Sequence, residues 1–156
     1  MTSRLGGILD PFEGRFIFVT FAAKHPLFLA YFRGSIHKQV HTMPTLNYHN
    51  RVFRPVSNTD NGETTADTRF HYQQEGAILT CTYAGGPIVK GQLLGLVDAE
   101  GRIDMRYHQL NAKGELMTGH CQSTPEVLPN GKIRLHESWQ WTSGDQSAGQ
   151  SVLEEV

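Results

Sequence analysis

A regular alternation of strand-forming runs and short turns, which begins at Asn50 and continues to the C-terminus, constrains the fold of this chain more than any other feature. Turns rich in Gly, Asn or Asp recur about every ten to twelve residues. In Glu100–Gly101 and Asn130–Gly131, for example, the glycine stands where a tight hairpin needs a positive φ. No helical periodicity of useful length interrupts this pattern. The alternation predicts an antiparallel meander in which strands adjacent in sequence are adjacent in the sheet.

The pattern gives eight strand candidates and predicts an all-β fold. An open meander of this size would leave two long edges, and closure into a barrel removes them. We therefore expect an eight-stranded antiparallel up-and-down barrel, whose interior holds side chains or one small ligand. The predicted strands are 51–57, 64–74, 77–84, 87–97, 102–110, 114–123, 132–142 and 148–155.

The first 45 residues do not follow this pattern, so we expect an irregular N-terminal extension followed by the barrel domain over 46–156. Its two apolar runs are each shorter than the ~20 residues that a membrane span needs. Asp10 and Glu13 precede these runs and do not fit a signal peptide. We expect the extension to be a helix or strand packed outside the barrel, or poorly ordered. A second interpretation is that translation starts at Met43, which would make residues 1–42 non-native.

Composition excludes several classes of partner. The formal net charge is -1 with 19% charged residues, so no strong electrostatic field favours nucleic acid or an anionic membrane. Cys81 and Cys121 form no C-x-x-C pair, and we expect two buried free thiols in a cytoplasmic protein. Only His37 and His41, in the extension, have a spacing typical of metal ligands, so neither a metal nor a cofactor is expected.

Alternation of side chains across a strand assigns the faces of the run 132–142. One face is apolar apart from an acid, and it must point into the barrel: Ile133, Leu135, Glu137, Trp139 and Trp141. A buried carboxylate costs several kcal/mol unless it is paired or protonated. We therefore expect Glu137 to have a partner inside, either Arg69 or a tyrosine. Burial would also raise its pKa and suit it to act as a general acid.

The same alternation on the other strands predicts a lumen with aromatic walls and a few polar groups, which is typical of a small-ligand site. A lumen filled by these side chains, without a ligand, fits the pattern as well. The predicted ligand-binding residues are Phe70, Tyr72, Tyr83, Tyr107, Gln109, Glu137, Trp139 and Trp141.

The run Gln92–Val97 is one residue away from the pyrophosphate loop Q/R-x-x-G-x-G/A of acetyl-CoA-dependent N-acetyltransferases, with Val97 at the last position. That loop needs a following helix whose N-terminus meets the phosphates. A hairpin turn at Asp98–Gly101 follows instead, so we predict a barrel strand here. Gly91 and Gly95 then mark bends or close approach of the backbone.

Seven stretches of the barrel segment carry a family resemblance: 47–51, 70–72, 83–86, 95–98, 105–109, 115–119 and 135–145. Through them, the chain from Leu46 to Glu155 resembles a family of small bacterial proteins without an established function, often labelled N-acetylglutamate synthase. That family is similar in architecture to lipocalin-like and streptavidin-like barrels, so the resemblance implies a calycin-like fold. It implies no catalytic residues, and the acetyltransferase label conflicts with an all-β fold.

These observations favour a protein that binds a small apolar or aromatic molecule in its lumen. Tyr83, Tyr107, Gln109 and Glu137 would orient the ligand. One alternative is an enzyme that uses Glu137 as a general acid or base in the same pocket. Another is a structural or interaction module that forms a homodimer through an exposed strand or through the extension.

Overall fold

The structure is a computed structural model that describes residues 5–9, 16–20 and 46–156. The chain divides into two compact units, Met1–Gln39 and Val40–Val156. In the first unit, β1 (Leu5–Leu9) and β2 (Phe16–Thr20) pair as an antiparallel two-stranded sheet.

Three predictions about the extension fall outside the described residues. They are the domain boundary after residue 45, the translation start at Met43, and the pair His37 and His41. All three stay predictions. Among the residues that the structure describes, no helix has the length and apolar character needed to cross a membrane.

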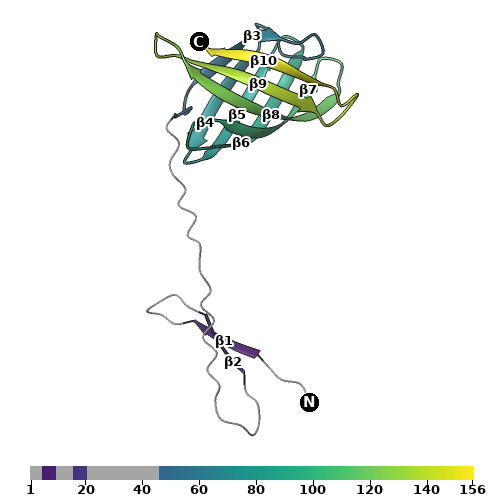
Figure 1. Cartoon of the computed structure of the whole chain (residues 1–156). Helices are drawn as coiled ribbons and strands as arrows, with labels where there is room; N and C mark the ends of the chain where they lie inside the picture. Colours follow the sequence, from purple (N-terminus) through teal and green to yellow (C-terminus); the bar gives the residue numbers. More distant parts are fainter. Residues whose placement is uncertain (1–4, 10–15, 21–45) are drawn as a thin grey trace. The chain divides into compact units, whose positions relative to one another are not determined.

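The second unit contains a closed antiparallel barrel, which confirms the predicted fold class (Figure 1). Its strand order is β10-β3-β4-β5-β6-β7-β8-β9, so consecutive strands are neighbours and β10 closes the barrel against β3. The strands are β3 (Val52–Asn58), β4 (Arg69–Glu75), β5 (Ile78–Gly85), β6 (Ile88–Val97), β7 (Ile103–Asn111), β8 (Leu116–Val127), β9 (Ile133–Trp141) and β10 (Ala148–Glu155). The run Gln92–Val97 lies in β6 and leads into the hairpin to β7, as predicted.

The hairpin between β8 and β9 fixes the register at the centre of the barrel. Gly131 has a φ of 81°, and the Leu128 amide donates to the Lys132 carbonyl at 2.8 Å. Pairing then runs without a bulge along both strands, because the turn sets which residues oppose each other. This register places Ser123 directly opposite Glu137.

The connection between β3 and β4 differs from the prediction, because β4 begins at Arg69 and not at residue 64. Thr64 and Thr65 favour strands, but local hydrogen bonds hold this segment as a turn. The Thr65 amide donates to Thr68 Oγ1 at 3.0 Å, and the Asp67 amide donates to Thr65 Oγ1 at 3.3 Å. Residues 59–68 are therefore a connection, which we call the mouth loop. Near it β3 and β4 separate, since they pair only at Val52–His71 and Phe53–Phe70.

The opposite end of the barrel is closed by the segment 46–51, and we call it the sealed end. Tyr48 has no exposed surface, and its hydroxyl donates to the Gly101 carbonyl at 2.6 Å. Its ring also packs edge-on against Tyr72, with centroids 6.2 Å apart. Tyr48 thus fills the lumen at this end, so that any open space must lie toward the mouth loop.

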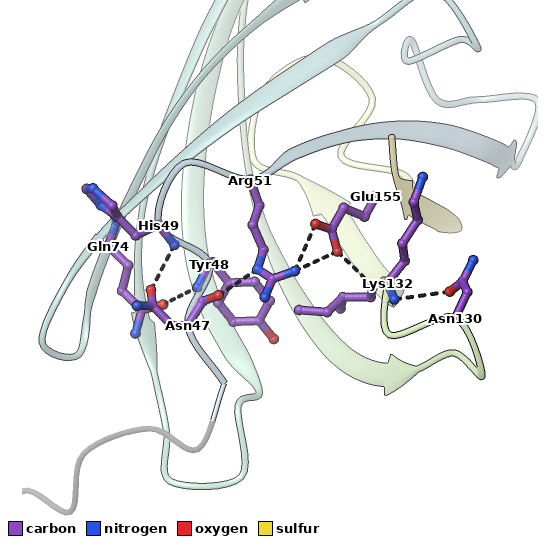
Figure 2. A network of polar contacts seen from close by, with 9 residues as sticks. Asn47, Tyr48, His49, Arg51, Gln74, Asn130, Lys132 and Glu155 are labelled. Carbon is purple, nitrogen blue, oxygen red and sulfur yellow. Dashed lines mark hydrogen bonds and ion pairs between the residues drawn. The ribbon is translucent and has the colours of Figure 1, made fainter.

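Polar contacts around the sealed end fix the segment to the barrel wall (Figure 2). The Arg51 guanidinium donates to both Glu155 carboxylate oxygens at 2.8 Å. Glu155 also accepts the Ile133 amide at 3.0 Å, and the Tyr48 amide donates to Gln74 Oε1 at 2.8 Å. Each partner lies on a different strand, so these contacts hold the end of the barrel together.

Candidate ligand-binding cavity

An open cavity of about 50 Å³ occupies the lumen between the mouth loop and the centre of the barrel. This volume exceeds the roughly 10–15 Å³ that one water molecule needs, but it is well below the ~300 Å³ of a typical drug-sized pocket. The lumen is thus neither filled nor spacious. The lining residues are Asn58, Gly62, Glu63, Thr64, Phe70, Tyr83, Leu93, Met105, Tyr107, Gln109, Cys121, Glu137, Trp139, Trp141 and Ser151.

The lining includes every residue predicted to bind the ligand except Tyr72. Tyr72 faces the lumen as predicted, but it lies deeper, fully buried in the core against Phe53 and Tyr48. Among the described residues its hydroxyl finds no hydrogen-bond partner. The ligand-binding role of all these residues stays a prediction.

Three of the aromatic rings that line the cavity each lie over a glycine on the neighbouring strand. The cross-strand pairs are Tyr83–Gly91, Tyr107–Gly119 and Trp139–Gly149. A Cβ atom on any of these glycines would collide with atoms of the opposing ring. Gly91 therefore marks a close approach, as predicted, and the glycines set the position of the rings.

The rings at the mouth lie in different planes. Tyr107 stands edge-on to Trp141, with centroids 5.4 Å apart and an interplanar angle of 74°. Trp139 is tilted by 62° against Trp141 at 5.7 Å. Trp141 Nε1 donates to the Asn61 carbonyl at 3.3 Å, which connects this wall to the mouth loop. The aromatic side chains that line the cavity come from four strands, β4, β5, β7 and β9.

Glu137 points into the lumen from β9, as the alternation of side chains predicts. Its carboxylate accepts hydrogen bonds from Ser123 Oγ at 3.0 Å and from Ser151 Oγ at 2.7 Å. Both serines are its direct cross-strand neighbours, on β8 and β10. The prediction that Arg69 or a tyrosine pairs with Glu137 is wrong, because the hydrogen bonds described for its carboxylate come from the two serines. The Arg69 guanidinium donates instead to the Ala66 carbonyl at 2.6 Å in the mouth loop.

Desolvation raises the pKa of Glu137 to about 7, and the hydrogen bonds from Ser151 and Ser123 partly oppose this rise. Glu137 lines the cavity and is half-buried as a residue. The expectation that its carboxylate is completely buried therefore stays a prediction. A carboxyl group that titrates near neutral pH meets the requirement for a general acid, and that role also stays a prediction.

The two cysteines face the lumen as buried free thiols, as predicted. Burial raises the pKa of both Cys81 and Cys121 far above the usual thiol range, so the thiols are protonated at neutral pH. Neither has the thiolate character of a reactive cysteine.

The mouth loop adds a second acid that the sequence analysis missed. Glu63 accepts the side-chain amide of Gln109 at 2.6 Å and that of Asn111 at 2.8 Å. Gln109 in turn accepts the Tyr83 hydroxyl at 3.0 Å. Nothing in the sequence indicated this role, because Glu63 lies between the predicted strands 51–57 and 64–74.

The histidines of the barrel lie away from this cavity. His108 and His136 are exposed on the outer face, as predicted, and His136 Nε2 lies 2.8 Å from Glu126 Oε2. Within the described part of the chain, no three His, Cys, Asp or Glu residues gather as they would around a metal ion. No residue of the cavity is thus marked as a metal ligand.

Comparison with known proteins agrees with this architecture. No curated protein and no solved structure matches the chain. Residues 46–156, which include all eight strands of the barrel, match the model of one family, described as "Avidin-like protein". With a closed eight-stranded barrel and most of its length matched, the chain belongs to the avidin-like protein family.

Proposed function

We propose that this protein binds a small molecule in the cavity between the mouth loop and Glu137. The observation that supports this most directly is an accessible space inside a barrel whose core is otherwise packed. Membership of the avidin-like family agrees with a small ligand. Apolar walls with a few convergent polar groups are the usual form of such a site.

The walls and the polar groups would have different roles. Rings of Phe70, Trp139 and Trp141 would contact apolar parts of the ligand, since aromatic side chains supply most of the buried area in such sites. Gln109 and Glu137 would orient it by hydrogen bonds. At about 50 Å³ the cavity takes a ligand, or the end of a ligand, with only a few non-hydrogen atoms.

A screen of compounds with up to about six non-hydrogen atoms, followed by ligand-observed NMR, tests this proposal. Both tryptophans line the cavity, so a compound that enters it should also change the tryptophan fluorescence. Cavity-bound compounds should lose affinity in Glu137→Gln. Glu75→Gln, at an exposed position on β4, is the matched control and should leave the affinity unchanged.

Two results would contradict the proposal. One is a screen in which no compound binds, repeated with xenon, which enters dry apolar cavities of small size. The other is a set of binders that leave tryptophan fluorescence unchanged and bind Glu137→Gln and wild type equally, since these would occupy the outer surface.

A further inference from the structure

We infer that the ligand of this cavity is an organic cation, a small alkylammonium ion held between the Glu137 carboxylate and the faces of Tyr107, Trp139 and Trp141. This inference rests on the proposed function, because it assigns a chemical class to the molecule bound in the same cavity. Four features of the described residues carry it: the charge of the lining, the surroundings of Glu137, the arrangement of the rings and an unsatisfied acceptor.

Among the described residues, the charged side chains that line the cavity are all acidic. Glu63 and Glu137 both border the cavity, whereas no Lys, Arg or His does so among the residues the structure describes. The remaining lining side chains are apolar groups, hydroxyls, amides and the Cys121 thiol. Two carboxylates around a small space with low-dielectric walls concentrate negative potential there, which attracts cations and repels anions.

Glu137 has no counter-charge among the described residues. Its two hydrogen bonds come from neutral hydroxyls, each of which leaves further lone pairs on the carboxylate free. The titratable groups that interact with it from other strands of the barrel are all neutral at pH 7 and none is basic: Tyr72 on β4, Cys81 and Tyr83 on β5, Tyr107 on β7 and Cys121 on β8. A bound cation would supply the missing opposite charge and so stabilise the ionised form of Glu137.

The rings supply the second half of a cation site. Tyr107 and Trp139 are tilted by 74° and 62° against Trp141, at centroid distances of 5.4 Å and 5.7 Å. Rings in different planes around one space can each present a face to the same bound group. A cation within about 6 Å of a ring centroid is attracted by the ring quadrupole, most strongly by Trp, and such cages select alkylated ammonium groups.

An unsatisfied acceptor favours an ammonium ion that keeps an N–H. Asn58 lines the cavity, and its Nδ2 donates to the Thr64 carbonyl at 3.1 Å and to Thr64 Oγ1 at 2.9 Å. Its Oδ1 is buried and, within the described chain, accepts no hydrogen bond. An acceptor without a donor is costly, so a ligand N–H that approached Asn58 would gain a hydrogen bond there.

Two probes of nearly equal shape test the inference, tert-butylammonium and neutral tert-butanol, together with anionic pivalate, which is two non-hydrogen atoms larger. Their size suits a space for roughly three to five water-sized groups. Affinities are measured at pH 8 and constant ionic strength, by tryptophan fluorescence and by protein NMR shifts. We expect tert-butylammonium to bind at least about tenfold more tightly than tert-butanol, and pivalate to bind most weakly.

Glu137→Gln should abolish the preference for the cation over tert-butanol, whereas the exposed control Glu75→Gln should keep it. Near-UV circular dichroism establishes that both variants are folded. Binding of the cation should also tighten as the pH rises from 6 to 8, because Glu137 has a pKa of about 7 and must lose its proton. Tert-butanol should show no such dependence.

The outcomes separate this inference from the proposed function. Equal or tighter binding of tert-butanol or pivalate would overturn the inference and leave a small-molecule site in place. A cation preference that survives in Glu137→Gln would overturn it too. If none of the three probes binds, the inference is wrong, and the compound screen described above decides the proposed function separately.

Discussion

The two ends of the barrel lumen differ in how completely side chains fill them. At the sealed end Tyr48 fills the lumen, and a charged pair between Arg51 and Glu155 connects the entering chain to the last strand. At the other end the mouth loop covers the lumen, yet leaves a cavity of about 50 Å³ bordered by two acids. The comparison teaches that close packing and accessible space lie at different ends of one fold, since tight packing and an accessible space exclude each other.

The largest expected effect contrasts a tyrosine at each end. Tyr48→Ala removes a fully buried ring and should lower the free energy of unfolding by about 3–5 kcal/mol. Tyr107→Ala, in the cavity wall, should cost about half as much, because this residue is already partly exposed. Urea denaturation followed by circular dichroism measures both. Equal losses would show that the two ends do not differ in packing.

The next effect concerns Glu137, which has no counter-charge in the part of the chain that the structure describes. Glu137 has a pKa of about 7 in the folded protein, against 4.5 for an ordinary Glu. Between these pH values the folded protein holds a proton that the unfolded chain has released. The free energy of unfolding should therefore fall as the pH rises from 4.5 to 8, by up to about 3 kcal/mol.

Glu137→Gln should reduce this slope, whereas Glu75→Gln at an exposed position should keep it. The measurement is a series of urea denaturation curves at different pH. An identical slope in wild type and Glu137→Gln would show that desolvation does not control this carboxylate, and would remove the basis for its high pKa.

The smallest effect compares one hydrogen-bonded carboxylate at each end. The Glu155 side chain is 15% exposed and accepts bonds from Arg51 and from the Ile133 amide, so Glu155→Ala should cost about 2 kcal/mol. Glu63→Ala should cost less than about 1 kcal/mol, because water in the cavity can replace the carboxylate. Thermal unfolding of both variants tests this. A larger loss at Glu63 would mean that the mouth loop is a structural part of the barrel.

The barrel and the inward faces of its strands could be predicted because turn chemistry and side-chain alternation are local. Pro129, Asn130 and Gly131 mark a hairpin without any knowledge of the rest of the chain. Counting outward from that turn pairs Glu137 with Ser123. One hydrogen-bond partner of Glu137 could therefore have been predicted from the sequence. The prediction of Arg69 failed because it considered charge and not register.

Other parts of the site depend on contacts between distant residues. Glu63 meets Gln109 and Asn111 only after the barrel has closed, and nothing in its neighbourhood of Thr and Asn indicates that role. Tyr72 shares its inward face with Phe70 but lies deeper in the barrel. Alternation of side chains gives the face of a strand, whereas depth along the lumen follows from the tilt and stagger of the whole barrel.

The glycines beneath the wall rings have a consequence for how this protein can change. Gly91, Gly119 and Gly149 do not border the cavity, yet each determines where an aromatic ring rests. Replacing one of them by a larger residue would push its ring inward or sideways and reshape the chamber from behind. The selectivity of such barrels can therefore change during evolution while every side chain that lines the cavity is kept. A comparison of two relatives that considers only the lining residues would miss such a change in cavity shape.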